Sequence, residues 1–312
     1  MTGQLLALAA MVMFASNILV TKAASARLDV GVGFVISIVV NVAFAALVFG
    51  VELALRTGAL RWDALGVAMF MLAGACATYL GRWFFFEAIA RLGPARASLF
   101  HVSSPAFTAV IAWVALGEAL VPRTAIAIAA TIAGLLLITV PPGVLRAAIA
   151  GRHATSGPAS AGQRWKAIVA SGFAIGAGAT LAYSIGNVLR GASVRQWNEP
   201  VAGAMLGALA ALGLQLVFGA RGAALVSRIR SAHGAGVGLY ALGGVLTISA
   251  QMCMIASMRY IPVAITTVIT LCTPLVVMPV SYFALRNQER IGARTLVGAA
   301  LTMAGMAIVV LR

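Results

Sequence analysis

Arg82 is a charged residue inside an apolar run of the sequence, which makes it the first place to look for chemistry. If that run is a membrane helix, a central charge costs about 2.5–3.5 kcal/mol on insertion scales, so a partner or a wet cavity is expected. A guanidinium can hold a carboxylate in a planar fork, and Arg82 is therefore a candidate anchor for an anionic substrate group. The alternatives are an ion pair with Glu87 or a side chain that reaches the interface. Glu87 is better spaced to pair with Arg91, four residues later.

Two asparagines lie in the middle of corresponding apolar runs, and their surroundings are similar at residues 15–19 and 185–189. If the two halves of the chain are related by an inverted symmetry, Asn17 and Asn187 would both face a central cavity. The alternative is a hydrogen bond between packed helices, which is common for asparagine in membranes.

His101 precedes Ser103, Ser104 and Pro105 within another apolar run. An imidazole that titrates near neutral pH could couple protons to transport. The alternative is a structural histidine whose hydrogen bonds are satisfied. No Asp or Glu lies in the middle of an apolar run, so protons are a candidate coupling ion only through this residue.

Further polar or aromatic residues near these positions are candidate liners of a substrate path: Tyr79, Tyr183, Gln251 and Thr270. Arginine beside aromatic and methionine side chains would suit an amphipathic or aromatic amino acid. Ordinary packing against the core or lipid is the alternative for each aromatic side chain.

Pro105 and Pro274 occupy corresponding positions in the two halves of the chain. A proline removes a helical hydrogen bond and bends the helix, so the pair is expected to interrupt two corresponding helices. Paired interruptions are typical of the binding region of secondary transporters, and both prolines are candidate hinges.

These residues need elements to position them, and the composition indicates which kind. The chain has 312 residues, of which 62% are hydrophobic and 9% are charged. A soluble domain is roughly 45–50% apolar and about 25% charged, so the solvent of this chain is a bilayer. The net charge of +15 comes from basic residues at the ends of apolar runs, which is typical of topology signals and of contact with anionic headgroups rather than of nucleic-acid binding.

Stretches of about 20 apolar residues can cross a membrane as helices. Ten fit, at about 4–24, 31–55, 63–89, 96–117, 122–140, 166–189, 200–219, 235–257, 262–285 and 291–311. The longest non-apolar stretch, 141–165, is expected to be a linker between residues 1–140 and 166–312. Each part then holds five spans. Because five is odd, the second part enters the membrane from the opposite side to the first. The expected fold is an all-α membrane protein of ten transmembrane helices in two inverted-topology five-helix repeats.

The residues that separate the apolar runs recur in the two halves and resemble the pattern of a known family. Arg91-Leu-Gly-Pro94, Pro105, Leu116-Gly117-Glu118 and Gly134 return as Arg259-Tyr-Ile-Pro262, Pro274, Glu289 and Gly305. This pattern resembles the repeat of the EamA family of the drug/metabolite transporter superfamily. The second copy departs from the first, because two additional residues precede Glu289. The resemblance implies a multi-pass carrier of the bacterial inner membrane with a central cavity, which exports small metabolites, amino acids or drugs.

The sequence therefore predicts a secondary transporter that exports a small organic metabolite, such as an amino acid, by alternating access. The alternatives are a multidrug efflux carrier, a channel and a non-transporting membrane protein. The scattered histidines His101, His153 and His233 do not favour an enzyme. The three cysteines have no metal-ligand spacing, and neither a metal nor a cofactor is expected. The expected partners are a small-molecule substrate and the lipid bilayer, and both a monomer and a homodimer are compatible with the sequence.

Overall fold

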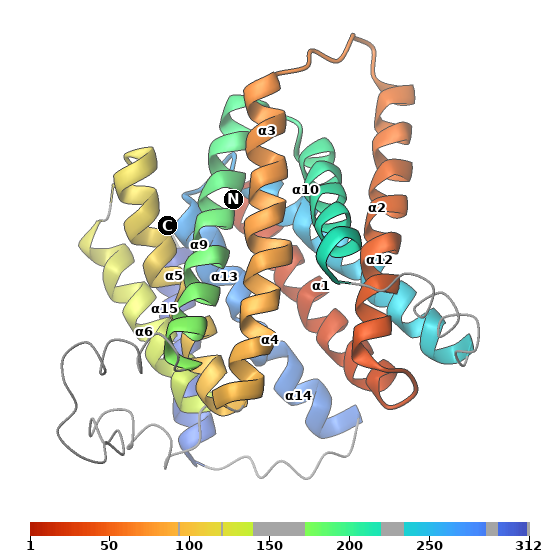
Figure 1. Cartoon of the computed structure of the whole chain (residues 1–312). Helices are drawn as coiled ribbons and strands as arrows, with labels where there is room; N and C mark the ends of the chain where they lie inside the picture. The colour runs from red at the N-terminus through yellow and green to blue at the C-terminus, as the bar shows by residue number, and fades with distance from the viewer. Residues whose placement is uncertain (93, 120, 140–171, 220–233, 285–292, 311–312) are drawn as a thin grey trace, which may run out of the picture. The chain divides into compact units, whose positions relative to one another are not determined.

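The computed structural model describes residues 1–92, 94–119, 121–139, 172–219, 234–284 and 293–310, and these form helices and short connections (Figure 1). No strand occurs in this part of the chain, which confirms the all-α prediction for it. The predicted linker at 141–165 lies outside the described residues. The helices are α1 (Thr2–Ser25), α2 (Val30–Leu55), α3 (Ala64–Ala73), α4 (Gly81–Leu92), α5 (Pro94–Leu116), α6 (Pro122–Thr139), α9 (Gly172–Gln196), α10 (Pro200–Leu214), α12 (Gly234–Ser257), α13 (Val263–Leu271), α14 (Pro274–Ala284) and α15 (Ala293–Val310).

Two π-helical stretches, η1 (Gly74–Leu80) and η2 (Gln215–Gly219), follow α3 and α10. By length and composition, five stretches could cross a membrane: Thr2–Ser25, Val30–Leu55, Ala64–Phe85, Pro200–Phe218 and Gly234–Ser257. Shorter apolar helices lie at Phe100–Leu116, Pro122–Leu137, Val263–Val277 and Leu296–Gly305. Each predicted span overlaps one helix or a set of consecutive helices. The number of helices that cross the bilayer stays a prediction.

The helix boundaries follow from local chemistry. The Asp29 carboxylate accepts hydrogen bonds from the backbone of Gly31 and Val32 and thereby caps α2, and Asp63 caps α3 through Gly66. A carboxylate at this position satisfies backbone N–H groups that have no partner within the helix. α5 ends at Leu116 because Gly117 adopts a φ of 64°, a left-handed conformation that favours glycine.

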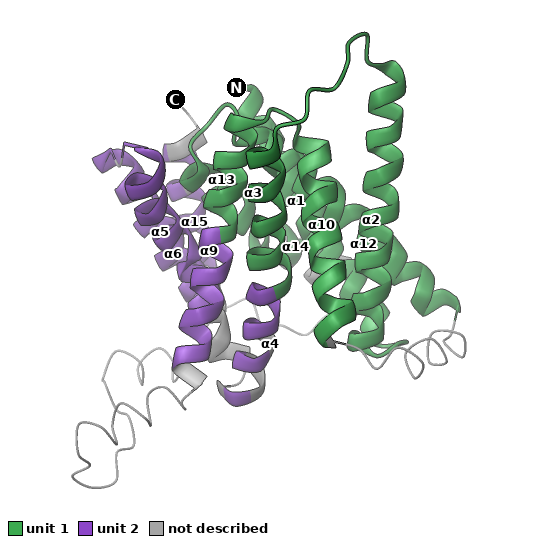
Figure 2. Ribbon diagram, turned by 45° about the horizontal axis from the view of Figure 1, so that its top comes forward, with its two compact units in different colours: residues 1–79, 186–289 green, residues 80–185, 290–312 purple. Residues whose placement is uncertain are grey.

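The chain divides into two compact units (Figure 2). Unit 1 comprises residues 1–79 and 186–289, and unit 2 comprises 80–185 and 290–312. Within unit 1, α12 packs against α1 and α2, α10 packs against α2 and α3, and α1 packs against α13. Within unit 2, α6 packs against α15, and α5 packs against α4 and α6. The boundaries at 79/80 and 185/186 fall inside helical segments, so these units are a different division of the chain from the two sequence repeats.

Small residues form much of the buried surface. Ala7, Ala10 and Ala15 of α1 are completely buried, whereas Leu47 of α2 and Val114 of α5 are 63% and 74% exposed. In water this distribution would be costly. In lipid it is expected, because small side chains let helices approach and large apolar side chains face the acyl chains.

The two candidate hinge prolines differ in their local structure. Pro274 begins α14 after a break at Cys272 and Thr273, as expected for an interrupted helix. Pro105 lies inside α5, which continues through it, so the expected interruption at this position was wrong. A proline removes one hydrogen bond, but the remaining turns of a long helix can hold the helix together. The role of both residues as hinges stays a prediction.

Candidate substrate site

A cluster of polar side chains surrounds Arg190 inside unit 1. We define the Arg190 cluster as Thr78, Asn187, Arg190 and Gln251. Each of the four is buried, and Arg190 is only 8% exposed. The Arg190 guanidinium donates to Asn187 Oδ1 at 3.2 Å through Nη1, and to Thr78 Oγ1 and Gln251 Oε1 at 3.1 Å through Nη2. Buried polar residues among apolar membrane helices are costly and commonly mark a substrate path.

Three different elements supply this cluster, and the local sequence explains how. Asn187 and Arg190 lie three residues apart on α9, so they share one face of the helix. Gln251 is on α12, and Thr78 is in η1. Gly186 of α9 packs close to Ala73 and Ala77, where even a methyl group would not fit. This close approach lets the hydroxyl of Thr78 reach the guanidinium.

Arg190 lies within a helix rather than in the predicted loop. The predicted span ended at 189, which left Arg190 in a loop, whereas α9 continues to Gln196. Ending an apolar stretch at its first charge hides an arginine that lies within the helix. The sequence did indicate a longer helix, because the next proline after Arg190 is Pro200. Asn187, three residues before Arg190, was already a candidate site residue.

A second polar cluster lies inside unit 2, around the predicted anchor Arg82. Arg82 makes a side-chain hydrogen bond with Tyr183. The His101 ring lies between Tyr183 and Phe85, with centroid distances of 5.1 and 5.2 Å. Thr180 of α9 donates to the Phe100 carbonyl at 2.8 Å, which helps to hold α9 against α5. The structure therefore brings together three predicted residues, namely Arg82, His101 and Tyr183.

The remaining predicted residues do not join either cluster through a described contact. Asn17 accepts a hydrogen bond from Thr21 at 3.3 Å and packs against Gly243 of α12. The Thr270 hydroxyl donates to backbone carbonyls of its own helix, including that of Thr266 at 2.9 Å. Tyr79 is half-buried in η1, next to Thr78 in sequence. Thr78 itself was not predicted, because a lone threonine in an apolar run has no distinctive pattern.

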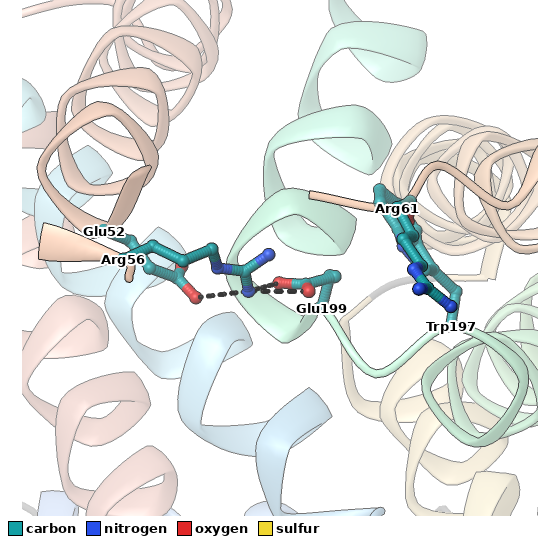
Figure 3. A network of polar contacts seen from close by, with 5 residues as sticks. All are labelled: Glu52, Arg56, Arg61, Trp197 and Glu199. Carbon is teal, nitrogen blue, oxygen red and sulfur yellow. Dashed lines mark hydrogen bonds and ion pairs between the residues drawn. The ribbon is translucent and has the colours of Figure 1, made fainter. Parts of the chain in front are cut away.

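An ion pair joins two helix ends of unit 1 (Figure 3). Arg56 follows α2, and its Nη2 lies 2.6 and 2.7 Å from the two carboxylate oxygens of Glu199, which precedes α10. Glu52 is a weaker second partner at 3.6 Å. Beside this pair, the indole of Trp197 donates to the Arg61 carbonyl at 2.9 Å. These residues lie at helix ends, and their contacts fasten the connections of unit 1.

The two partners of Arg56 provide a matched test of that ion pair. We expect Glu199→Gln to lower the Tm in detergent more than Glu52→Gln does, because Glu199 makes two short contacts and Glu52 makes one longer contact. High salt should reduce the difference, since these side chains are partly exposed and screened. Equal effects of the two substitutions on thermal unfolding would contradict this ranking.

Asp63 makes the stability of this helix end depend on pH. Hydrogen bonds from the Gly66 backbone at 2.8 Å and from Gln196 at 2.9 Å hold the pKa of Asp63 below its ordinary value of 3.8. A carboxyl group with a lowered pKa stabilises the folded state at any pH above its pKa in the unfolded state. This stabilisation is lost as the pH falls through the pKa of the folded state. We expect Asp63→Asn to lower the Tm at pH 6, with a difference from the unmodified protein that shrinks below about pH 4.

A second substitution separates the charge from the helix cap in that experiment. Asp63→Ala removes the side-chain acceptor altogether, so its Tm should stay below that of Asp63→Asn at every pH. Thermal unfolding in detergent from pH 3 to pH 7 measures both differences. A constant difference between the unmodified protein and Asp63→Asn down to pH 3 would contradict the assignment.

Comparisons with known proteins add a fold and a similarity to one family. A search of curated proteins found no match. Among solved structures 27 chains match. One of them, titled only as the crystal structure of a protein, has a TM-score of 0.70 over 99% of this chain and 96% of its own, with 18% sequence identity. At that identity the likeness shows the fold alone.

The family comparison concerns the first part of the chain. Residues 1–140 match the family model described as the EamA-like transporter family. The resemblance drawn from the repeated sequence pattern is confirmed over that range. The apolar helices fit a multi-pass membrane protein. Over residues 1–140 this chain is therefore similar to the EamA-like transporter family, whose proteins are membrane transporters.

Proposed function

We propose that this protein is a secondary transporter that exports a small organic metabolite, such as an amino acid or a related compound, across the bacterial inner membrane by alternating access. The observation that carries the proposal is the family match over residues 1–140. The two polar clusters support it, because polar side chains that converge among apolar helices provide contacts for a small organic molecule.

The contacts between α6 and α15 support an inverted repeat. These helices are the last of each sequence repeat, and Gly134 and Gly305 are corresponding residues. A Cβ at Gly305 would meet Thr131, and a Cβ at Gly134 would meet Thr302. The glycine of each copy thus contacts the threonine of the other copy. The order of these contacts along α6 is the reverse of their order along α15, so the two helices are antiparallel. This antiparallel, reciprocal packing is expected when the second copy enters the membrane from the opposite side.

The predicted site residues receive these roles in the proposal. Those in unit 1 that would line the substrate path are Asn17, Tyr79, Asn187, Gln251 and Thr270, and those in unit 2 are Arg82, His101 and Tyr183. Pro105 and Pro274 would bend during alternating access. His101 is the proposed group for proton coupling, although its packing against two aromatic rings also suits a structural role.

Counterflow in proteoliposomes tests the function. Purified full-length protein is reconstituted, loaded with an unlabelled compound, and mixed with a trace of the same compound in labelled form. A secondary transporter should give saturable counterflow that needs no ATP. An ohmic current without saturation would instead indicate a channel, and counterflow only of lipophilic cations would indicate a multidrug carrier. An imposed pH gradient in the same vesicles tests proton coupling.

A further inference from the structure

We infer that Arg190 binds the anionic group of the substrate, so that the transported compounds are small organic acids with a free carboxylate. The inference deepens the proposed function and rests on it. Arg190 lies beyond the predicted end of the span at residue 189 and was not among the residues predicted to bind substrate. The supporting observations are the burial of Arg190, the contacts that orient its guanidinium, and the π-helical turn at Thr78.

The charge of Arg190 suits an anionic ligand. A guanidinium remains protonated at every pH at which a protein is folded, so Arg190 places a permanent positive charge among the apolar helices of unit 1. Its described hydrogen bonds are to two side-chain amides and one hydroxyl. These neutral groups orient the plane of the guanidinium. In such surroundings the Coulomb attraction between the guanidinium and a carboxylate is stronger than in water, because the local dielectric is low.

The orientation of the Arg190 guanidinium also suits a carboxylate. The acceptors of Arg190 come from η1, from α9 itself and from α12, so they fix the guanidinium from several sides. Thr78 belongs to a π-helical turn, and such turns occur frequently at functional sites. The side-chain amide N–H groups of Asn187 and Gln251 can donate to the oxygens of a bound carboxylate, since their carbonyl oxygens face Arg190. An arginine flanked by two amides is a suitable set of donors for such a group.

Arg82 and Arg190 differ in their burial and in the contacts described for them. Arg82 is half-buried, and the described contact of its guanidinium is with a phenol hydroxyl. Arg190 is more deeply buried and is oriented by three hydrogen-bond acceptors. A rigid, oriented guanidinium distinguishes a carboxylate from a neutral amide better than a mobile guanidinium does. The burial and orientation of Arg190 therefore favour it for selection of the anion.

The test uses matched pairs of compounds that differ only in the charge. The probes are phenylalanine and phenylalaninamide, leucine and leucinamide, and succinate and succinamide. Each pair is measured by counterflow in proteoliposomes and by the thermal shift of the purified full-length protein in detergent. The unmodified protein should prefer at least one acid over its amide about tenfold or more.

The variants separate charge recognition from folding. Arg190→Gln should lower the acid-to-amide ratio at least tenfold, and Arg190→Lys should restore part of it, because lysine keeps the charge without the planar fork. The ratio is the readout because a merely destabilised protein loses transport of both compounds equally. Arg61→Gln removes an exposed arginine of the same unit and should leave the ratio unchanged. Arg190→Gln could also transport neither compound. In that case the inference is supported if the variant still unfolds cooperatively near the Tm of the unmodified protein, but its Tm no longer rises when the acid is added.

The failures of the two proposals can be distinguished. Equal transport of acids and amides by the unmodified protein would overturn the inference and leave the transporter proposal intact. So would an acid preference that Arg190→Gln retains, or one that is lost in Arg82→Gln but not in Arg190→Gln. An unmodified protein that gives neither counterflow nor a thermal shift with any pair would overturn both the transporter proposal and the inference.

Discussion

Replacing Arg82 by alanine should lower counterflow about tenfold or more for acids and amides alike. Arg82 is hydrogen-bonded to Tyr183, whose ring packs against His101. The substitution removes the charge and the hydrogen bond together. A hydrogen bond to a charged group contributes roughly 1.5–3 kcal/mol, and about 1.4 kcal/mol corresponds to a factor of ten. Initial rates of counterflow at equal amounts of reconstituted protein give the comparison.

The control for Arg82 is Arg123→Gln, which changes an exposed arginine at the start of α6 in the same unit. This variant should transport at the unmodified rate. Counterflow by Arg82→Ala that equals the rate of the control would show that Arg82 does not contact the substrate. If only the acids lose transport in Arg82→Ala, the anion would belong to Arg82 rather than to Arg190.

Replacing Gly74 by alanine should destabilise the protein by about 1–3 kcal/mol or more, through overpacking. Gly74 begins η1, and a Cβ there would overlap the backbone of Gly207 on α10. Backbone atoms have no alternative rotamer, so α10 and η1 must separate. Because Thr78 lies in η1, the separation should also disturb the Arg190 cluster and slow transport. Thermal unfolding in detergent and counterflow measure the two effects.

Gly207 provides a control at the same helix contact. A Cβ at Gly207 would lie 3.4 Å from Gly74 Cα and 3.5 Å from the Phe70 carbonyl oxygen, which are ordinary van der Waals distances. Gly207→Ala should therefore keep the Tm close to that of the unmodified protein, since alanine also favours the helix by about 1 kcal/mol. Equal losses of Tm in Gly74→Ala and Gly207→Ala would contradict the asymmetric packing described for this contact.

The helical class of the protein and the approximate position of each helix were predictable from the sequence. Long apolar stretches in lipid must satisfy their backbone hydrogen bonds internally, so composition alone specifies helices. Pro122 and Pro200 mark helix starts, and Gly117 marks a helix end. The pairing of Glu87 with Arg91, at 2.7 Å, was also predictable and is confirmed, because it depends on a separation of four residues on one helix.

The membership of the site depended on tertiary structure. Asn187, Gln251, Arg82, His101 and Tyr183 could be proposed from their types and positions. Their grouping could not, because it depends on which helix faces which and on close approaches such as the one at Gly186. Arg190 shows the reason most clearly. Its sequence position at the end of an apolar run resembles an interfacial charge, and only the continuation of α9 and the packing of η1 and α12 around it make Arg190 a buried side chain.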